Sequence, residues 1–388
     1  MSRGLESAMP KSVLLHIGTG KTGSTSIQRW FSDAQERGRF AQICYPLWES
    51  DRNHRRIVAL YKPYEDLPPG MRQSYGPNGR AYGRMLYRYR EFLFKRLLEA
   101  NKAVISEEWL YHLSSPQLVT KLREDLELLG FREFHVVLYV RDPADFFLSQ
   151  MQERLKGWHK SPFIIDPTRF KYEFLKGAEN WESVFPGRLI VRKFSNDASF
   201  DVIKDFSMVL QQCLGVELPW APLEENTSLS AEGMKILQDY QEAFWPDSCF
   251  KTPDVSRLVQ FLGNSKQCTR QTKPTLRREF ADIIRANHED EAKALYRRYG
   301  VDLCVGPTTS ANVPSPRGDS YRVDEIVESV DAKVVNRLLL CLANEEMVRS
   351  HRLLSFARNA YAKIPSLLRP KLLKNWLRRR LLGYPEGT

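Results

Sequence analysis

The sequence predicts a three-layer α/β fold, in which helices cover both sides of a central parallel sheet and further helices follow toward the C-terminus. Three observations predict it. Residues 13–17 form an apolar run, residues 134–140 have the apolar, β-branched composition of a buried strand, and residues 188–194 read as a further strand. Helical patterns follow these runs, as parallel strands require. With 388 residues, of which 42% are hydrophobic, the chain can bury one large core.

A loop of small residues around one lysine follows the first predicted strand. Residues 13–28 read VLLHIGTGKTGSTSIQ, and a helical pattern begins near Ser24. Glycines at positions 18, 20 and 23 let the backbone bend so that several amide groups point inward, and the helix N-terminus adds its positive dipole end. The segment therefore predicts a cradle for a phosphate or sulfate group.

The loop differs from that of a nucleoside triphosphatase. The Walker pattern Gly-x-x-x-x-Gly-Lys-Ser/Thr would need a glycine where this chain has Leu15, inside the apolar run. Lys21 and Thr22 remain, and hydroxyl groups follow at Ser24 and Thr25. These side chains form a donor-rich face for a terminal group with three equivalent oxygens.

A second segment adds an arginine at the end of another predicted strand. The run 134–140 is followed by Arg141, Asp142 and Pro143, and then by a helical stretch that carries Ser149. Ligands bind at the carboxyl ends of parallel strands, where the forked guanidinium of Arg141 suits a phosphate. The alternative is that Arg141 and Asp142 pair locally while Ser149 faces solvent.

Together, the two motifs resemble those of sulfotransferases that use 3′-phosphoadenosine 5′-phosphosulfate (PAPS). The loop is most similar to that of bacterial carbohydrate sulfotransferases, which reads His-Ile-Gly-x-x-Lys-Thr-Gly-Thr/Ser-Thr-Ser. Arg-Asp-Pro, with a serine eight residues after the arginine, resembles their 3′-phosphate motif. Residues 188–194 and the amphipathic helix that opens at Asp201 are similar to the later core of the family, so the resemblance covers residues 1–305.

The resemblance implies a P-loop-type sulfotransferase fold and a PAPS-dependent enzyme that works without a metal. Such an enzyme transfers a sulfuryl group from PAPS to a hydroxyl of a carbohydrate, which is a polysaccharide or glycolipid. Lys21 is then the catalytic cation on the leaving 5′-phosphate. The residues that would bind PAPS are Thr19, Gly20, Lys21, Thr22, Gly23, Ser24, Thr25, Arg141 and Ser149.

The reaction also needs a base near the acceptor hydroxyl. His54 lies in residues 41–79, which read as a long loop on the acceptor side, and a near-neutral pKa would suit proton removal. Alternatively, His54 is a solvated loop histidine. Glu108 follows a predicted strand at residues 103–107, and the Ser-x-Glu pattern there resembles one in the bacterial enzymes, whose relatives use a glutamate base. A carboxylate at a strand end can equally anchor Lys21 or an arginine in a structural salt bridge.

We expect the sulfotransferase domain at residues 1–305, with inserted acceptor-side loops and a helix at 41–100. A linker is expected to follow at 306–320. A helical extension at 321–388 ends in a basic amphipathic segment at 363–382. Lying on an anionic membrane is one role for such a segment. The other is that of a terminal helix packed on the domain with a solvated basic rim.

Charge and cysteine usage bear on location and partners. The formal net charge of +11 favours anionic partners, and no nucleic-acid motif accompanies it. The six cysteines lack the paired spacing of a zinc site or disulfide framework, which favours a reducing compartment. No secretory h-region or membrane-spanning run is present, whereas Golgi-type relatives carry an anchor. We therefore expect a bacterial-style cytoplasmic enzyme, peripheral on the inner face of the membrane if the basic segment binds lipid.

Two rival functions share some of these features. A P-loop kinase would use Lys21 and Thr22 but would need Mg²⁺ and an acidic residue at a strand end, where this chain has Arg141. A non-catalytic protein that binds polyanions or membranes would explain the charge but not the paired motifs. Of the remaining histidines, His16 is expected to hold the loop by hydrogen bonding, and His288 to lie on a solvated helix face within residues 276–299.

Overall fold

The computed structural model forms two compact units whose segments alternate along the chain. The first comprises residues 1–147, 168–225 and 281–313, and the second comprises 148–167, 226–280 and 314–388. Within these, the structure describes residues 10–38, 42–113, 115–158, 163–197, 199–218, 228–244, 252–265, 270–303, 318, 321–344 and 356.

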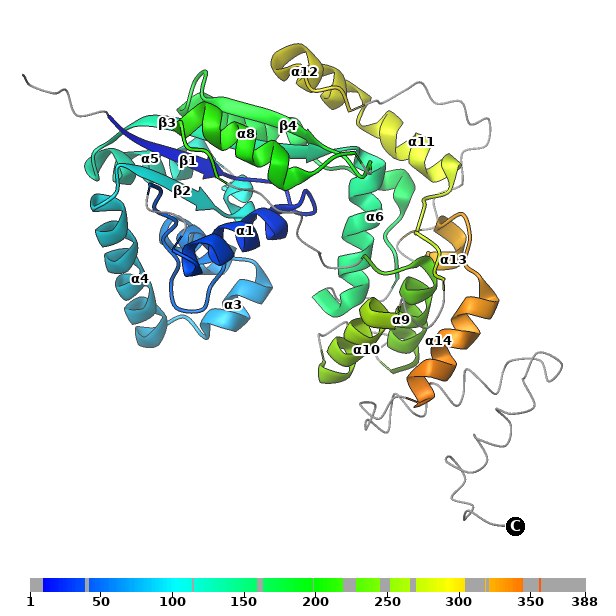
Figure 1. The fold of residues 1–388 in the computed structure, drawn as a ribbon. Coiled ribbons are helices and arrows are strands. Elements are labelled where there is room, and N and C mark those ends of the chain that lie inside the picture. The colour runs from blue at the N-terminus through cyan, green and yellow to red at the C-terminus, as the bar shows by residue number, and fades with distance from the viewer. Residues whose placement is uncertain are drawn as a thin grey trace, which may run out of the picture. The chain divides into compact units, whose positions relative to one another are not determined.

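A four-stranded sheet forms the centre of the first unit (Figure 1). Its strands are β1 (Lys11–His16), β2 (Lys102–Ser106), β3 (Phe131–Arg141) and β4 (Leu189–Phe194). They lie in the order β2-β1-β3-β4, and every neighbouring pair is parallel. The predicted α/β class, with a parallel sheet flanked by helices and a helical C-terminal region, is confirmed.

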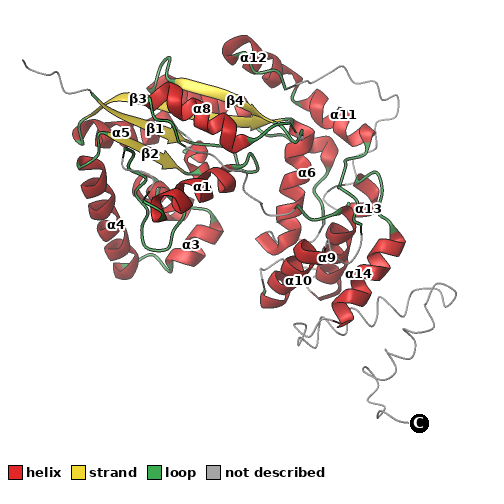
Figure 2. Ribbon diagram, viewed as in Figure 1, coloured by secondary structure: helices red, strands yellow, loops and turns green. Residues whose placement is uncertain are grey.

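Helices connect the strands, as Figure 2 shows. Those of the first unit are α1 (Ser24–Glu36), α2 (Val58–Tyr61), α3 (Pro69–Tyr75), α4 (Arg80–Leu98), α5 (Pro116–Leu128), α7 (Phe174–Val184), α8 (Val202–Leu214) and α12 (Glu289–Tyr299), with 3₁₀ turns η1 (Arg55–Ile57), η2 (Tyr64–Asp66) and η3 (Glu108–His112). A further 3₁₀ turn, η5 (Pro167–Arg169), and two helices, α6 (Pro143–Glu153) and α11 (Arg278–Asn287), run across the boundary between the units.

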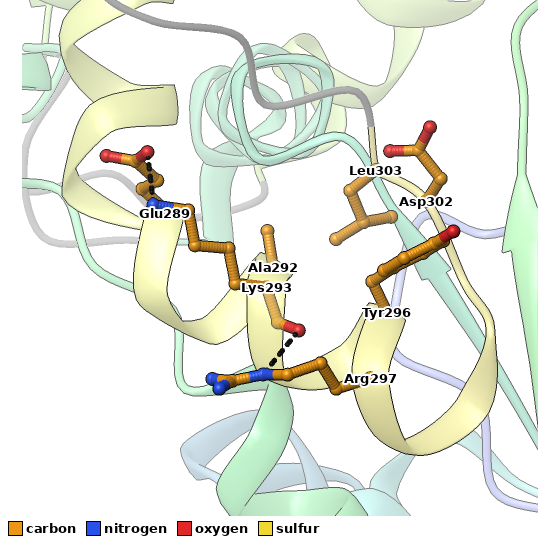
Figure 3. Close-up of a pocket in the computed structure, with 7 residues that line it drawn as sticks. All are labelled: Glu289, Ala292, Lys293, Tyr296, Arg297, Asp302 and Leu303. Carbon is orange, nitrogen blue, oxygen red and sulfur yellow. Dashed lines mark hydrogen bonds and ion pairs between the residues drawn. The ribbon is translucent and has the colours of Figure 1, made fainter.

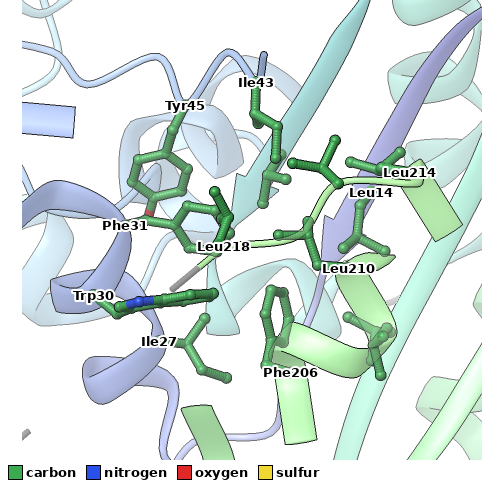
Figure 4. Packing of buried hydrophobic residues seen from close by; sticks show 14 of the residues in the cluster. Leu14, Ile27, Trp30, Phe31, Ile43, Tyr45, Phe206, Leu210, Leu214 and Leu218 are labelled. Carbon is green, nitrogen blue, oxygen red and sulfur yellow. The ribbon is translucent and has the colours of Figure 1, made fainter. Parts of the chain in front are cut away.

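The core of the first unit lies where α1 and α8 pack on one face of the sheet (Figure 4). Leu14 from β1 contributes to this cluster with Phe31 from α1 and Phe206 from α8. Phe31 stacks on Tyr45 with ring centroids 4.7 Å apart. Because side chains alternate along a strand, the intervening residues of β3 face α5 and α7, and the paired strand β1 is buried as well.

Two predicted segments differ from the structure. Residues 41–79 were expected to be a long loop, but they contain the short helices η1, α2, η2 and α3. The expected helix between 276 and 299 is divided into α11 and α12 at His288. His288 is buried rather than solvated. Both ring nitrogens are satisfied there, since Nδ1 bonds to the Ile284 carbonyl at 2.6 Å and Nε2 accepts from the Tyr172 N–H at 2.8 Å.

The second unit is helical. It contains the π-helical turn η4 (Arg154–Trp158) and helices α9 (Ala231–Phe244), α10 (Pro253–Asn264), α13 (Val323–Ile326) and α14 (Ala332–Asn344). The buried Glu232 of α9 accepts hydrogen bonds from the main-chain N–H groups of Thr272 at 3.0 Å and Asp331 at 3.2 Å. One carboxylate therefore ties two connecting segments to the central helix of this unit.

Several predictions fall largely outside the described residues. Of the linker predicted at 306–320, only Gly318 is described, and the basic amphipathic segment at 363–382 lies outside entirely. Among the residues that are described, none belongs to a helix long and apolar enough to cross a membrane.

Candidate anion-binding site

The candidate site lies at the carboxyl edge of the sheet, between β1 and β3. From β1 the chain passes to β2 on one side, and from β3 it passes to β4 on the other side. This reversal creates a switch point, where loops diverge and leave a crevice in which α/β proteins bind ligands. The glycine-rich loop follows β1 and Arg141 ends β3, so the fold brings the two predicted motifs to the same switch point.

The loop after β1 has the backbone conformation of a cradle. Lys21 has a positive φ of 68°, and Gly23, the N-cap of α1, has a φ of 78°. A Cβ at Gly23 would lie 2.9 Å from Val202 and 3.0 Å from Phe194, so the position excludes a side chain by both backbone and space. The loop thus leads directly into the N-terminus of α1, where unpaired amides favour an anion.

Two of the predicted hydroxyl ligands hold the loop itself. Thr19 donates to the Tyr139 carbonyl at 3.0 Å, and Thr22 donates to the Thr19 carbonyl at 2.6 Å. Both residues are buried, and both hydroxyl groups donate within the protein rather than toward a ligand. Ser24 Oγ is buried without a hydrogen-bond partner, and Thr25 is exposed.

Arg141 connects the second motif to the first. Its Nη1 donates to the main-chain carbonyl of Lys21 at 2.9 Å, and its guanidinium lies 5.3 Å from the centre of the Phe194 ring. The Arg141 Nε is buried without a hydrogen-bond partner, with Asp145 at ion-pair distance, 4.0 Å. Burial lowers the pKa of Arg141, against the opposing effect of Asp145 and Asp142. This donor is thus positioned beside the loop and is incompletely satisfied.

Asp142 does not pair with its neighbour Arg141. Its Oδ1 accepts the N–H groups of Ala144 at 2.9 Å and Asp145 at 3.0 Å, which caps the start of α6. Its Oδ2 accepts from Nε of Arg285 at 2.9 Å, and the second guanidinium nitrogen of Arg285 reaches Oδ1 at 3.4 Å. A forked arginine from a late helix therefore fixes the turn that carries Arg141.

Ser149 lies on α6, as predicted, and is half-buried. The boundary between the two units falls between Phe147 and Leu148, within this helix. Ser149 belongs to the second unit and the cradle to the first, so its assignment as a PAPS ligand stays a prediction.

Glu108 lies against the glycine-rich loop. It begins η3, with Glu107 between it and β2, and its Oε2 is 3.3 Å from the position that a Cβ on Gly20 would occupy. The main-chain N–H of Glu107 donates to the His16 carbonyl at 3.0 Å, which holds this strand end beside β1. The predicted base candidate is thus brought to the cradle by strand pairing.

His16 was expected to hold the loop by hydrogen bonding, but its side-chain hydrogen bond goes to β2 instead. Its Nδ1 is 2.7 Å from the hydroxyl of Ser106, which joins the ends of β1 and β2. Its Nε2 is buried without a partner and lies 2.9 Å from where a Cβ of Gly18 would be. Burial lowers the pKa of His16 to about 3, so the ring is neutral at physiological pH.

His54 is neither solvated nor near-neutral in pKa. It is 1% exposed, and its Nδ1 accepts from the main-chain N–H of Ser106 at 3.0 Å. Its ring packs edge-on against Tyr45 with centroids 4.5 Å apart. Burial lowers the pKa of His54 to about 4, despite the hydrogen bonds to the backbone of Ser106 and Pro46. The expected near-neutral pKa is wrong, because the ring is buried and burial disfavours its charged form.

Glu107 is the titratable group of this edge that sequence reasoning passed over. It is 1% exposed, and burial, with the neighbouring charge of Glu108, raises its pKa to about 8. Oε1 accepts from the Trp109 N–H at 3.1 Å, whereas Oε2 is buried without a partner. The available signal was position, since Glu107 directly follows a buried strand, but Glu108 was chosen because of the family pattern.

A cavity of about 440 Å³ lies elsewhere in the first unit. Figure 3 shows its lining residues, which are Glu289, Ala292, Lys293, Tyr296, Arg297, Asp302 and Leu303. None of the predicted site residues lines it. The described residues contain no group of three or more His, Cys, Asp or Glu side chains that could hold a metal ion. No family model, curated protein or solved structure matches the chain, so the likeness to PAPS-dependent sulfotransferases rests on the motifs themselves.

Proposed function

We propose that the protein is a sulfotransferase that moves a sulfuryl group from PAPS to a hydroxyl of a carbohydrate acceptor. The observation that carries the proposal is the hydrogen bond from Arg141 to the Lys21 carbonyl, at the switch point of a parallel sheet. A loop of amides and a buried arginine with a spare N–H suit a ligand with two separate phosphate groups, and 3′-phosphoadenosine 5′-phosphosulfate is such a ligand.

Unsatisfied buried atoms support the fit of a bound anion. Ser24 Oγ, His16 Nε2 and Arg141 Nε are all buried without a hydrogen-bond partner, and they belong to the first residue of α1 and to the last residues of β1 and β3. Leaving such groups unpaired costs about 1–3 kcal/mol each. Oxygens of a bound 5′-phosphosulfate and 3′-phosphate would remove part of that cost.

In the proposed reaction, the acceptor oxygen attacks the sulfur in line with the 5′-phosphate. The new O–S bond forms as the bond from sulfur to the phosphate oxygen breaks, and the acceptor proton passes to Glu108. Lys21 and the loop amides stabilise the negative charge that develops on the leaving phosphate. The products are a sulfate ester and 3′-phosphoadenosine 5′-phosphate.

Glu108 is favoured over His54 as the base because of placement. The Glu108 carboxylate lies against Gly20 of the cradle, whereas His54 is buried with Nδ1 bonded to the backbone of Ser106. A polysaccharide or glycolipid acceptor, a cytoplasmic location and membrane contact through residues 363–382 remain part of the proposal, by resemblance and composition.

Calorimetric titration with 3′-phosphoadenosine 5′-phosphate tests the proposal, with ATP and Mg²⁺ in parallel. We expect the bisphosphate to bind, and Lys21→Ala and Arg141→Ala each to weaken it by roughly ten- to hundred-fold, since hydrogen bonds to charged groups contribute about 1.5–3 kcal/mol. Lys95→Ala and Arg84→Ala remove the same charges from exposed positions of α4 and should leave binding unchanged. Binding of ATP with magnesium in place of the bisphosphate would establish a kinase instead.

A second measurement tests the chemistry. PAPS is supplied with a panel of polysaccharide and glycolipid acceptors, and sulfate ester formation is followed. Retained transfer in the protein that carries both Lys21→Ala and Arg141→Ala would overturn the proposal. Binding of polyanions or vesicles unchanged by Lys21→Ala, without any affinity for the bisphosphate, would support a non-catalytic binding protein.

A further inference from the structure

A group of buried and half-buried polar side chains around Glu107 takes no part in the proposed reaction. It consists of Arg55, Arg56, Tyr75, Tyr89 and Glu107, and we refer to it as the Glu107 cluster. All five belong to the first unit. Glu107 places the cluster next to the cradle, because its main-chain N–H bonds to the His16 carbonyl at 3.0 Å and its neighbour Glu108 lies against Gly20.

The two tyrosines of the cluster end in unsatisfied hydroxyl groups. Tyr75 ends α3 and Tyr89 lies in α4, and the hydroxyl of each is buried without a hydrogen-bond partner. Tyr89 is 1% exposed. Burial and the charge of Glu107 raise the pKa of Tyr89, and burial raises that of Tyr75 to about 12, with Glu107 adding to it. Both phenols thus lie within electrostatic reach of the same carboxyl.

The two arginines of the cluster stand on the turn η1. Both form ion pairs with Asp51 through a terminal guanidinium nitrogen. The Nε atoms of Arg55 and Arg56 are buried without a hydrogen-bond partner. The guanidinium of Arg56 lies 6.0 Å from the centre of the Tyr75 ring. The positive charge of Arg55 acts on Glu107 and on Tyr75, since it lowers the pKa of each.

Hydrogen-bond capacity in the cluster is unbalanced toward donors. Two guanidinium N–H groups and two phenol hydroxyls lack an acceptor, and the single opposing group is Oε2 of Glu107. Because burial and Glu108 raise the pKa of Glu107 to about 8, that carboxyl holds a proton at neutral pH and adds a fifth donor. A neutral sugar hydroxyl offers one acceptor oxygen and one donor, whereas a carboxylate or phosphate offers acceptors only.

We propose that the Glu107 cluster is an acceptor subsite that binds an anionic oxygen group, a carboxylate or phosphate, already present on the carbohydrate. That the bound molecule is the carbohydrate acceptor rests on the proposed function. That the bound group is an anion rests on the unsatisfied donors. An anion held by the cluster would set the neighbouring part of the acceptor beside Glu108 and the cradle. The enzyme would then select acidic glycans by a contact separate from the PAPS site.

Direct binding tests the subsite without turnover. Methyl β-glucuronide, glucose 6-phosphate and the uncharged methyl β-glucoside are titrated into the full-length protein by calorimetry. We expect an anionic probe to bind at least about ten-fold more tightly than the glucoside. Preference for the glucuronide or for the phosphate identifies the source of the anion. Equal affinity for the charged and uncharged sugars would overturn the proposal, and would mean that water satisfies the donors.

Two variants of the cluster and one matched control localise the binding. Tyr75→Phe removes a single hydroxyl, Arg56→Gln removes a charge, and Arg84→Gln removes the same charge from the exposed face of α4. We expect the first two to weaken the anionic probe by about five-fold or more and the control to leave it unchanged. An equal loss in Arg84→Gln would show general charge attraction and overturn the proposal. Unchanged affinity for the anionic probe in the Tyr75→Phe protein would also overturn the proposal. This variant keeps the ion pairs to Asp51, one of which Arg56→Gln removes.

The same proteins are titrated with 3′-phosphoadenosine 5′-phosphate, which separates the subsite from the proposed function. Loss of the anionic probe with intact bisphosphate binding is the result expected of Tyr75→Phe. If the unaltered protein binds the glucuronide but not the bisphosphate, the sulfotransferase proposal fails while the anion site stands. If it binds the bisphosphate but shows no preference for anionic sugars, the subsite fails and the sulfotransferase proposal stands.

Discussion

Arg141 Nη1 donates a hydrogen bond to the main-chain carbonyl of Lys21 at 2.9 Å, and this contact joins the end of β3 to the loop that follows the adjacent strand β1. It also restrains the loop, because Lys21 has a positive φ that a lysine adopts only at a cost. The arginine therefore has two roles in the structure, one in holding the loop and one through its remaining N–H groups. Changes around this pair should alter folding and ligand binding together.

Gly23→Ala tests how tightly the loop is packed. Its φ of 78° and the 2.9 Å approach to Val202 both oppose a Cβ, so we expect the free energy of unfolding to fall by roughly 2–4 kcal/mol. Gly215→Ala is the matched control, because its φ of 60° is similar but nothing lies within 4 Å of the added atom. We expect it to cost only about 1–2 kcal/mol. Urea denaturation measures both, and equal losses would show that strain alone, not space, selects Gly23.

Arg285→Gln should loosen the turn that carries Arg141. The side chain loses its two contacts to Asp142, and because the pair is half-buried we expect a loss of about 1–2 kcal/mol in unfolding free energy. Lys293→Gln breaks an exposed pair with Glu289 and should cost about 0–0.5 kcal/mol.

Arg285 is proposed as a positioning residue, so stability alone does not test it. Under conditions where the Arg285→Gln protein is fully folded, its affinity for 3′-phosphoadenosine 5′-phosphate should fall by roughly three- to ten-fold, because Arg141 is less well placed. An unchanged affinity would assign Arg285 to stability only.

Glu107→Gln should change how stability depends on pH. The folded pKa of about 8 lies above that of an unfolded glutamate, so between about pH 4.5 and pH 8 the folded state binds a proton that the unfolded state has lost. The stability that this proton provides is complete below the unfolded pKa and is lost as pH rises through the folded value. The slope is at most about 1.4 kcal/mol per pH unit.

Because glutamine does not titrate, the Glu107→Gln protein should gain stability relative to the unaltered protein as pH rises across that window, with no further gain above it. Urea denaturation at a series of pH values measures the difference. Glu124→Gln, at an exposed position of α5, is the control and should give a constant difference. A constant difference for Glu107→Gln as well would show that the carboxyl is solvated or paired.

Tyr89→Phe should leave stability unchanged or raise it by up to about 1 kcal/mol, because the hydroxyl that it removes is buried without a partner. Tyr61→Phe removes a buried hydroxyl that does have one, Asp125 Oδ2 at 3.0 Å, and should cost about 1 kcal/mol. Thermal unfolding compares the two. A larger loss of unfolding free energy in Tyr89→Phe than in Tyr61→Phe would show that the Tyr89 hydroxyl has a hydrogen-bond partner. It would then not be an unsatisfied donor of the Glu107 cluster.

Local sequence patterns predicted the elements that depend on local forces. The runs at 13–17 and 134–140 form the two central strands, because both faces of such a strand are covered and the pattern is continuous. The helix that opens at Asp201 begins as expected, since Asp201 Oδ1 accepts from the N–H groups of Ile203 at 2.8 Å and Lys204 at 3.0 Å.

The contacts that shape the candidate site join residues distant in sequence, and no local pattern contains them. Asp142 pairs with Arg285, which follows 143 residues later. His54 is buried beside Tyr45 and bonds to Ser106 of β2, which is 52 residues away in the chain, and residues 41–79 gave no strong periodicity from which to expect their short helices. The likeness to a family likewise drew attention to Glu108, whereas burial, which only the fold reveals, distinguishes Glu107.

The order of the strands has a consequence for folding. The loop that holds Lys21 and the helix that follows it lie within the first 36 residues of the chain. Arg141, which bonds to this loop, is much later in the sequence, on the strand β3 that pairs with β1. Contacts of such high sequence separation form late, because the entropy of closing the intervening chain opposes them. A partly folded chain can therefore contain the glycine loop without the arginine, so affinity for a bisphosphate nucleotide would report the assembled sheet. Such a ligand would in turn stabilise only molecules that have completed it.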